Sequence, residues 1–282
     1  MSTKHLPLVV LLLATGCHHG SADLTVERGL EHAKLDVSHK LERAALAYRK
    51  TCDAGDADGC LQLALLYAHG RGVERNLERA AILYQRACDG GSPRGCSNLG
   101  GLYVRGEGVV QSNARAVALF ERACAFENVE GCFNLAVMVS EGKGIDVNEP
   151  RAVDLFARAC DAGLAEGCGA LGLMYAHGAG IPNDDAYAAK LYARACGVGF
   201  MQACDNLGFM FAAGRGVAKD DANALVLFKQ SCDQGNPGGC YNLAMMYRQG
   251  RGVNNPSEAP APAAPADNLP PRLVSRNLEA KR

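Results

Sequence analysis

The sequence predicts an all-α protein, an α-solenoid built from 36-residue helix–turn–helix repeats. Two observations predict it: a Cys-x₇-Cys pair recurs six times at constant phase, and helix-forming columns with helix-stop glycines recur in the same register. Self-similarity at a period of about 20 to 50 residues is typical of arrays whose units pack on their neighbours. The pairs are Cys52/Cys60, Cys88/Cys96, Cys124/Cys132, Cys160/Cys168, Cys196/Cys204 and Cys232/Cys240.

The first helix of each repeat is predicted to follow the second Cys and to end at a Gly-x-Gly turn, as in 60–70. Its third position is always Leu, the next is always small, and an aromatic ring or Val follows three residues later. These offsets place the three columns on one helical face. A Gly directly after a helix favours the left-handed conformation that satisfies the last carbonyls.

The second helix is predicted to begin at a column of good N-caps and to run to the first Cys of the next pair, as in 76–88. An Ala column allows close contact with the first helix, and a Tyr or Phe column fills the seam. Three residues after the first Cys a Gly ends the helix, except in the third such turn, where Glu127 takes its place. The N-caps are Asn76, Ser112, Asn148, Asp184 and Asp220.

The repeat register predicts a solenoid over residues 40–253. Pro256 stands where the next N-cap would fall, and six of the eleven prolines lie between Pro256 and Pro271. A seventh second helix cannot form there, so residues 254–282 are predicted to be a Pro/Ala-rich disordered tail.

The N-terminus is predicted to be a signal peptide over residues 1–16. Lys4 precedes a short apolar stretch that is well below the length needed to span a bilayer. The sequence Leu-Ala-Thr-Gly-Cys at its end resembles the lipobox of bacterial lipoproteins, which implies a lipid on Cys17 and sorting to the outer membrane. An ordinary cleaved signal peptide is the alternative. Residues 17–39 match the repeat poorly and are expected to be a tether or a capping segment.

The paired cysteines are expected to form disulfides within each helix–helix turn. Structural zinc sites commonly separate Cys ligands by two to four residues, so seven intervening residues favour a disulfide over the zinc alternative. Disulfides persist in oxidising compartments, in agreement with export. Twelve of the thirteen cysteines are then consumed, which leaves Cys17 for the lipid.

The composition excludes nucleic-acid binding and suggests no cofactor. Lys plus Arg total 29 against 30 acidic residues, and the net charge of −1 provides no long-range attraction to nucleic acid. The seven His are scattered, and no metal site is predicted. We expect a monomer that meets the membrane through its lipid anchor only.

The columns Asn-Leu-(Ala/Gly)-x-x-Tyr, Gly-x-Gly-Val and Ala-x-x-Leu-(Tyr/Phe) resemble the Sel-one-like repeat, a relative of the tetratricopeptide repeat. With the Cys-x₇-Cys staple, residues 40–253 resemble the secreted cysteine-rich Hcp family. The resemblance implies a right-handed superhelix that binds protein segments on a concave face lined by the first helices. It also implies two alternatives: β-lactamase or penicillin-binding activity, described for some Hcp proteins, and redox or haem-related assembly, because a mitochondrial cytochrome-oxidase assembly factor shares the pattern.

Catalysis by a serine β-lactamase finds little support in the residues. The one Ser-x-x-Lys, Ser140 to Lys143, lies where a first helix ends, and neither Ser-Asp-Asn nor Lys-Thr-Gly is present. The better candidate for ligand binding is an amide column two residues after the second Cys, because Asn can bond both groups of a peptide backbone. The alternative role for these amides is to hold the neighbouring turn. The column is Asn98, Asn134, Asn206 and Asn242, with Gln62 and Ala170 as departures.

The sequence therefore predicts a non-catalytic scaffold outside the cytoplasm. Its expected partner is a protein, a peptide or a peptidoglycan fragment.

Overall fold

The computed structural model describes residues 39–252, and every regular element in this range is a helix. The signal peptide, Cys17, most of the tether and the Pro/Ala-rich tail lie outside the described residues. The first helices of the repeats are α2 (Ala57–His69), α4 (Pro93–Arg105), α6 (Val129–Glu141), α8 (Ala165–His177), α10 (Met201–Ala213) and α12 (Pro237–Arg248). The second helices are residues 39–53, α3 (Leu77–Asp89), α5 (Asn113–Ala125), α7 (Glu149–Asp161), α9 (Asp185–Gly197) and α11 (Asp221–Asp233).

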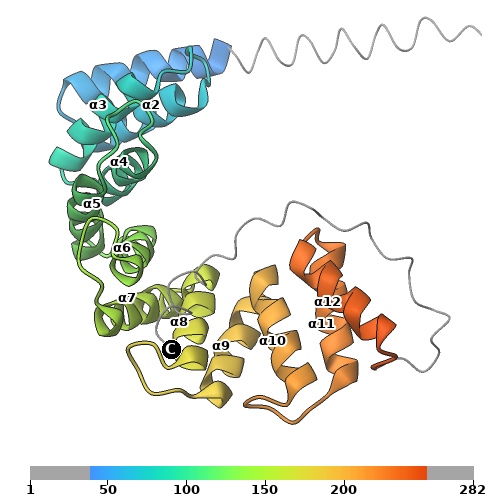
Figure 1. The fold of residues 1–282 in the computed structure, drawn as a ribbon. Coiled ribbons are helices and arrows are strands. Elements are labelled where there is room, and N and C mark those ends of the chain that lie inside the picture. Colours follow the sequence, from blue (N-terminus) through green and yellow to red (C-terminus); the bar gives the residue numbers. More distant parts are fainter. Residues whose placement is uncertain (1–38, 253–282) are drawn as a thin grey trace, which may run out of the picture.

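The helices follow one another around an open arc, each packed on the next (Figure 1). Consecutive first helices also touch, α4 against α6 and α10 against α12, and they lie toward the inner side of the curve. The predicted solenoid is confirmed, with the first helices along its concave side.

Most of the predicted helix ends are confirmed. In α3, α5, α7, α9 and α11 the N-cap side chain accepts a hydrogen bond from the backbone N–H three residues later, which satisfies a donor that the helix leaves unpaired. The first Gly of each Gly-x-Gly turn adopts a left-handed conformation, as Gly70 does at φ 65°. Glu127 adopts the same conformation, φ 59°, where the other repeats have Gly.

The predicted start of the first helices is wrong by one turn. Each begins three residues before the second Cys, so the second cysteines lie inside the first turn and do not precede the helix: Cys60, Cys96, Cys132, Cys168, Cys204 and Cys240.

A second column of capping residues lies directly before this earlier start. The side chain of Asp56, Ser92, Asn128 or Asn236 accepts a hydrogen bond from a backbone N–H at the start of the helix. In the repeats of Cys168 and Cys204, Leu164 and Phe200 occupy the capping position without a side-chain hydrogen bond, yet the helix begins at the same place.

The core is assembled from rings that lie on small residues, as predicted. A Cβ added at Gly100 would meet the Phe120 ring, and one at Gly172 would meet the Tyr192 ring. Small side chains here bring neighbouring helices close enough to exclude water. The Ala column of the second helices is fully buried to the same end: Ala80, Ala116, Ala152, Ala188 and Ala224.

All six predicted disulfides are formed, with Cα–Cα distances of 4.4 to 4.7 Å. Ten of their cysteines are buried, whereas Cys232 and Cys240 in the last repeat are half-buried. The bonds are Cys52–Cys60, Cys88–Cys96, Cys124–Cys132, Cys160–Cys168, Cys196–Cys204 and Cys232–Cys240.

The disulfides join helix ends, as expected, but the turn between the two helices is shorter than the seven residues that separate the cysteines. Each joins the last turn of a second helix to the first turn of the next first helix. The turn itself is short, as in residues 90–92 between α3 and α4, because both cysteines of a pair belong to the helices. Within residues 39–252, no helix is both long and apolar enough to cross a bilayer.

Candidate functional site

The inner face presents a repeating stripe of side chains from the first helices. Positions two and five residues after the second Cys lie on one side of each helix, because three residues is close to one turn. The amide column at position two is half-buried in every repeat. Position five is mainly apolar and half-buried or exposed: Leu65, Gly101, Val137, Leu173, Phe209 and Met245. The inner face thus alternates amide and apolar groups along the arc.

Near the N-terminal end this stripe forms a cleft of about 390 Å³ between α2 and α4. Leu65 from one repeat and Asn98 from the next both line it, above Tyr84 of α3. Basic side chains that can donate hydrogen bonds surround the apolar floor of the cleft: His69, Arg75 and Arg105.

Two of these basic groups already have partners. Arg105 Nε lies 2.8 Å from Glu107 Oε2, and Glu107 also lines the cleft. Arg75 donates a hydrogen bond to the Ala68 carbonyl. The cleft is therefore held by internal contacts at its rim.

Burial of Tyr84 raises the pKa of its phenol to about 12, against the opposing charges of Arg105 and Arg94. The hydroxyl therefore stays protonated at neutral pH and can donate or accept a hydrogen bond at the floor of the cleft. Burial also raises the pKa of the Tyr192 phenol, and the positive charge of Arg215 lowers it in part.

The amide column contacts the second helices. Asn206 lies near the hydroxyl of Tyr192, a ring of the preceding second helix. Asn98 lies in the cleft with the equivalent ring, Tyr84. In the register of Asn134 and Asn242 the equivalent residues are Phe120 and Phe228, which carry no hydroxyl to bond.

Ser140 and Lys143 are engaged separately. The Ser140 hydroxyl donates to the Val137 carbonyl at 3.0 Å, and Lys143 Nζ pairs with Glu141 at 2.6 Å. No base activates the serine in this arrangement. No group of three His, Cys, Asp or Glu side chains within the described part of the chain could hold a metal.

Asp205 is a half-buried carboxyl that the repeat pattern does not predict. It lies in α10 at a position occupied in other repeats by residues such as Leu61 and Phe133, and this departure was the available signal. Burial raises the pKa of its carboxyl to about 6, although the nearby Ser231 hydroxyl lowers it in part. Its Oδ2 accepts a hydrogen bond from Asn236 at 2.8 Å, which ties α10 to the last turn.

The fold and its inner face define a class of protein: a disulfide-stapled α-solenoid with a continuous concave surface. The Sel1 repeat model matches residues 57–92, 93–125, 129–164, 165–199, 202–236 and 237–259. The chain belongs to the Sel1 repeat family, a fold of protein-interaction scaffolds, and its Cys-x₇-Cys staples agree with the resemblance to the cysteine-rich Hcp proteins.

Two solved structures show the same fold. A Sel1 repeat protein from Oxalobacter formigenes is 26% identical with a TM-score of 0.73, covering 82% of this chain and 92% of that one. A protective antigen of uropathogenic Escherichia coli is 31% identical with a TM-score of 0.70, covering 74% of this chain. The match spans only 45% of that antigen. Helicobacter pylori cysteine rich protein B is 30% identical over 48% of this chain and 97% of its own, with a TM-score of 0.40. No curated protein matches the sequence.

Proposed function

We propose that this protein is a non-catalytic scaffold that binds an extended segment of a protein, or a peptidoglycan-derived peptide, along its concave face. The observation that carries this proposal is the stripe of the first helices, where an amide of one repeat lies beside an apolar side chain of its neighbour, as Asn98 and Leu65 do in the cleft. An amide can bond both the N–H and the C=O of an extended backbone, while the apolar positions accept side chains.

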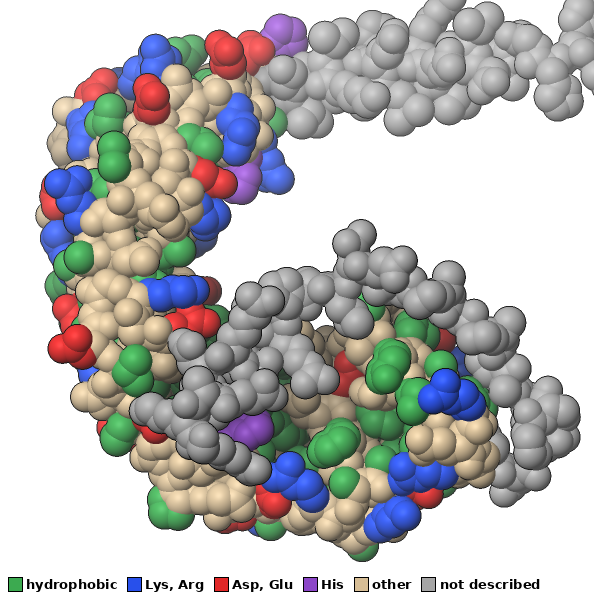
Figure 2. Space-filling view, in the orientation of Figure 1, with side chains coloured by type: hydrophobic (Ala, Val, Ile, Leu, Met, Phe, Trp, Pro, Cys, Tyr) green, Lys and Arg blue, Asp and Glu red, His purple; other side chains and the backbone are tan. Residues whose placement is uncertain are grey.

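The width of the surface supports a peptide more than a small molecule. Solenoid curvature produces an extended concave face suited to a long partner. Apolar groups on that face remain accessible, as Phe209 is 53% exposed. Space-filling shows the chain curving around this hollow, with hydrophobic side chains among basic ones on the C-terminal arm (Figure 2).

The test is photo-crosslinking in the native host with a photoreactive residue at Phe209 on the inner face. The matched control carries it at Val226 of α11, which is 64% exposed on a second helix. We expect a discrete adduct from Phe209 and none from Val226, and a lower yield when Asn206→Ala is added. Adducts from Val226 with none from Phe209 would reject the concave site.

The catalytic alternative has its own readout. The engaged Ser140 and Lys143 predict that purified protein does not hydrolyse nitrocefin. Nitrocefin turnover that disappears in Ser140→Ala would reject the non-catalytic scaffold and identify a serine enzyme.

The six disulfides indicate an oxidising compartment outside the cytoplasm. We further propose that a lipid on Cys17 anchors the protein to the cell envelope, since all other cysteines are paired. Fractionation of Cys17→Ser should move the protein out of the membrane fraction, and retention there would contradict the anchor.

A further inference from the structure

Neighbouring second helices are joined by a repeating arginine contact on the side away from the concave face. An Arg two residues before the first Cys reaches the C-terminal end of the preceding second helix. Arg86 and Arg194 each donate to the carbonyl of the preceding repeat's first Cys at 2.8 Å. A cation is favourable at this end of a helix because the free carbonyls there carry partial negative charge.

In three interfaces the same Arg also meets an aspartate that directly follows that Cys. Each partner lies 33 residues before its arginine. A carboxylate is thus the regular partner of this arginine column. Nitrogen–oxygen distances are 3.4 Å for Arg86 with Asp53, 3.2 Å for Arg122 with Asp89 and 3.6 Å for Arg194 with Asp161.

The interface between α5 and α7 retains the arginine and lacks the aspartate. Arg158 donates to the Cys124 carbonyl at 3.2 Å, but the position of the aspartate is Ala125. Among the described residues, no carboxylate lies within ion-pair distance of Arg158. Between α9 and α11 the aspartate is replaced by Gly197 and the arginine by Gln230. Within the described residues, the interface between α5 and α7 is therefore the one that keeps the arginine without the aspartate.

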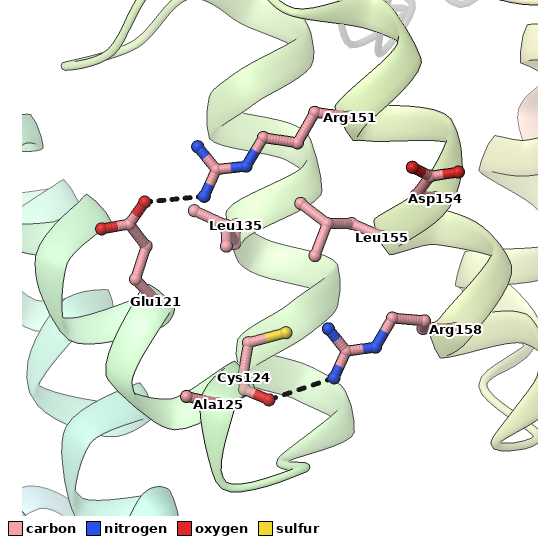
Figure 3. Close-up of a pocket in the computed structure, with 8 residues that line it drawn as sticks. All are labelled: Glu121, Cys124, Ala125, Leu135, Arg151, Asp154, Leu155 and Arg158. Atoms are coloured by element: carbon pink, nitrogen blue, oxygen red, sulfur yellow. Dashed lines mark hydrogen bonds and ion pairs between the residues drawn. The ribbon is translucent and has the colours of Figure 1, made fainter.

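A cleft of about 370 Å³ opens at this place (Figure 3), between α5 and α7 on the outer side of the arc (Figure 1). Leu135 and Leu155 lie between its two arginines, Arg151 at one end and Arg158 at the other. Arg151 is already paired with Glu121 at 2.7 Å, which closes that end. The open end therefore combines an available guanidinium with an apolar floor.

The turn beside the cleft departs from the repeat in two further positions. Phe126 is 57% exposed, and Glu127 holds the left-handed conformation that the other five turns assign to Gly. Such a conformation strains a non-glycine residue, and strained residues often cluster at binding sites. An exposed aromatic ring thus stands next to the cleft.

We propose that this outer cleft docks a partner protein through an acidic side chain followed by an apolar one. The acidic side chain takes the place of the missing aspartate and pairs with Arg158, while the apolar side chain lies on Leu135 and Leu155. A carboxylate is the expected ligand because the arginine is positively charged and because the equivalent arginines of the other repeats pair with aspartates. Asp154, one helical turn from Arg158 and also lining the cleft, is the carboxylate of this chain that competes for it.

The test is an NMR titration of the folded, oxidised protein with N-acetyl-Asp-Leu-amide as the probe. We expect saturable shifts of the Ala125 and Phe126 amides and of the Arg158 side-chain signal, with affinity at least about fivefold weaker for N-acetyl-Asn-Leu-amide. Sodium acetate, which carries the charge without the apolar group, should bind more weakly than the Asp probe.

Two variants make the result decisive. Ala125→Asp restores the aspartate of the other repeats and should abolish binding without loss of fold, whereas Asp154→Asn should strengthen it. Arg194→Gln, at an interface that keeps its own aspartate, should leave binding unchanged. Equal affinity for the Asp and Asn probes, undiminished binding to Ala125→Asp, or shifts confined to the concave face would each overturn the proposal. The concave crosslink at Phe209 is independent of these outcomes.

Discussion

Among single residues, two departures from the repeat carry local energetic costs. Glu127 adopts φ 59° where the other repeats have Gly, and Asp205 is a half-buried carboxyl beside α12. Both occur within otherwise regular helices and turns, so each can be tested by one substitution without disturbing the array.

Glu127→Gly should raise stability by about 0.5 to 1 kcal/mol, because glycine has no Cβ to oppose the left-handed conformation. Urea denaturation with the disulfides intact measures the change. Glu127→Ala retains a Cβ and is the control; an equal gain in this variant would mean that the glutamate side chain, and not backbone strain, sets the cost.

Asp205 makes stability depend on pH in a defined direction. Its pKa of about 6 exceeds the ordinary value near 3.8, so between these values the folded protein binds more protons than the unfolded chain. Stability should therefore fall as pH rises from about 4 to 6 and remain lower above 6.

Asp205→Asn removes this charge and keeps an acceptor for Asn236. We expect it to stabilise the protein by about 1 to 2 kcal/mol at pH 7.5 and by almost nothing at pH 4, measured by denaturant unfolding at both pH values. Asp146→Asn at an exposed site serves as the control. A gain that is the same at both pH values would contradict a burial effect.

Among the structural elements, the Gly-x-Gly turn has two separate functions. The first glycine ends a first helix, while a Cβ at the second would overlap the backbone at the start of the second helix one repeat earlier. Gly108, for example, lies against Leu77 and Glu78, and Gly72 against Leu41. The turn therefore packs against the preceding repeat and also ends a helix.

Gly108→Ala should lower the melting temperature more than Gly91→Ala. Both glycines have positive φ, but an added Cβ at Gly91 meets nothing within 4 Å. Gly91→Ala reports the conformational cost of about 1 kcal/mol alone, and Gly108→Ala adds a backbone clash. Equal losses in thermal unfolding would show that close packing of the repeats at this turn contributes little.

In the molecule as a whole, the arc protects its interior repeats and leaves its end less covered. The last first helix, α12, has no described second helix after it, and its disulfide is the one whose cysteines are half-buried. The buried disulfides Cys124–Cys132 and Cys160–Cys168 lie in the middle of the array. Solenoids depend on contacts between neighbours, so a terminal unit has fewer of them.

The disulfide Cys232–Cys240 should consequently be reduced first under native conditions. Brief treatment with a phosphine followed by alkylation and mass spectrometry should label these two cysteines before Cys88 and Cys96, which are at most 1% exposed. Simultaneous labelling of all pairs would instead indicate cooperative unfolding of the array.

The solenoid itself can be predicted because its determinants are local and repeated. N-caps such as Asn76 and helix-stop glycines such as Gly70 act within a few residues. The starts of the first helices are harder to place from sequence. The second cysteines, such as Cys132, are the prominent markers, whereas the cap that begins the helix lies four residues earlier, at Asn128 in this repeat.

The candidate site is predicted less completely than the fold. The amide column can be identified from its spacing, but the proximity of Asn206 to Tyr192 depends on how the helices pack. Helix starts can also depend on packing rather than on local sequence. Leu164 and Phe200 offer no capping side chain, yet the helices that contain Cys168 and Cys204 begin in register with the others.

The amino-acid sequence alone is sufficient to predict the repeat length, the helix type, most helix ends and the pairing of twelve cysteines, because spacing and capping operate over short distances along the chain. The three-dimensional packing was needed to learn which helices line the inner curve, that the second glycine of each turn packs on the preceding repeat, that Asp205 is half-buried and that Arg158 lacks its aspartate. Each of these depends on contacts between residues about 30 positions apart, which the packing of successive repeats creates.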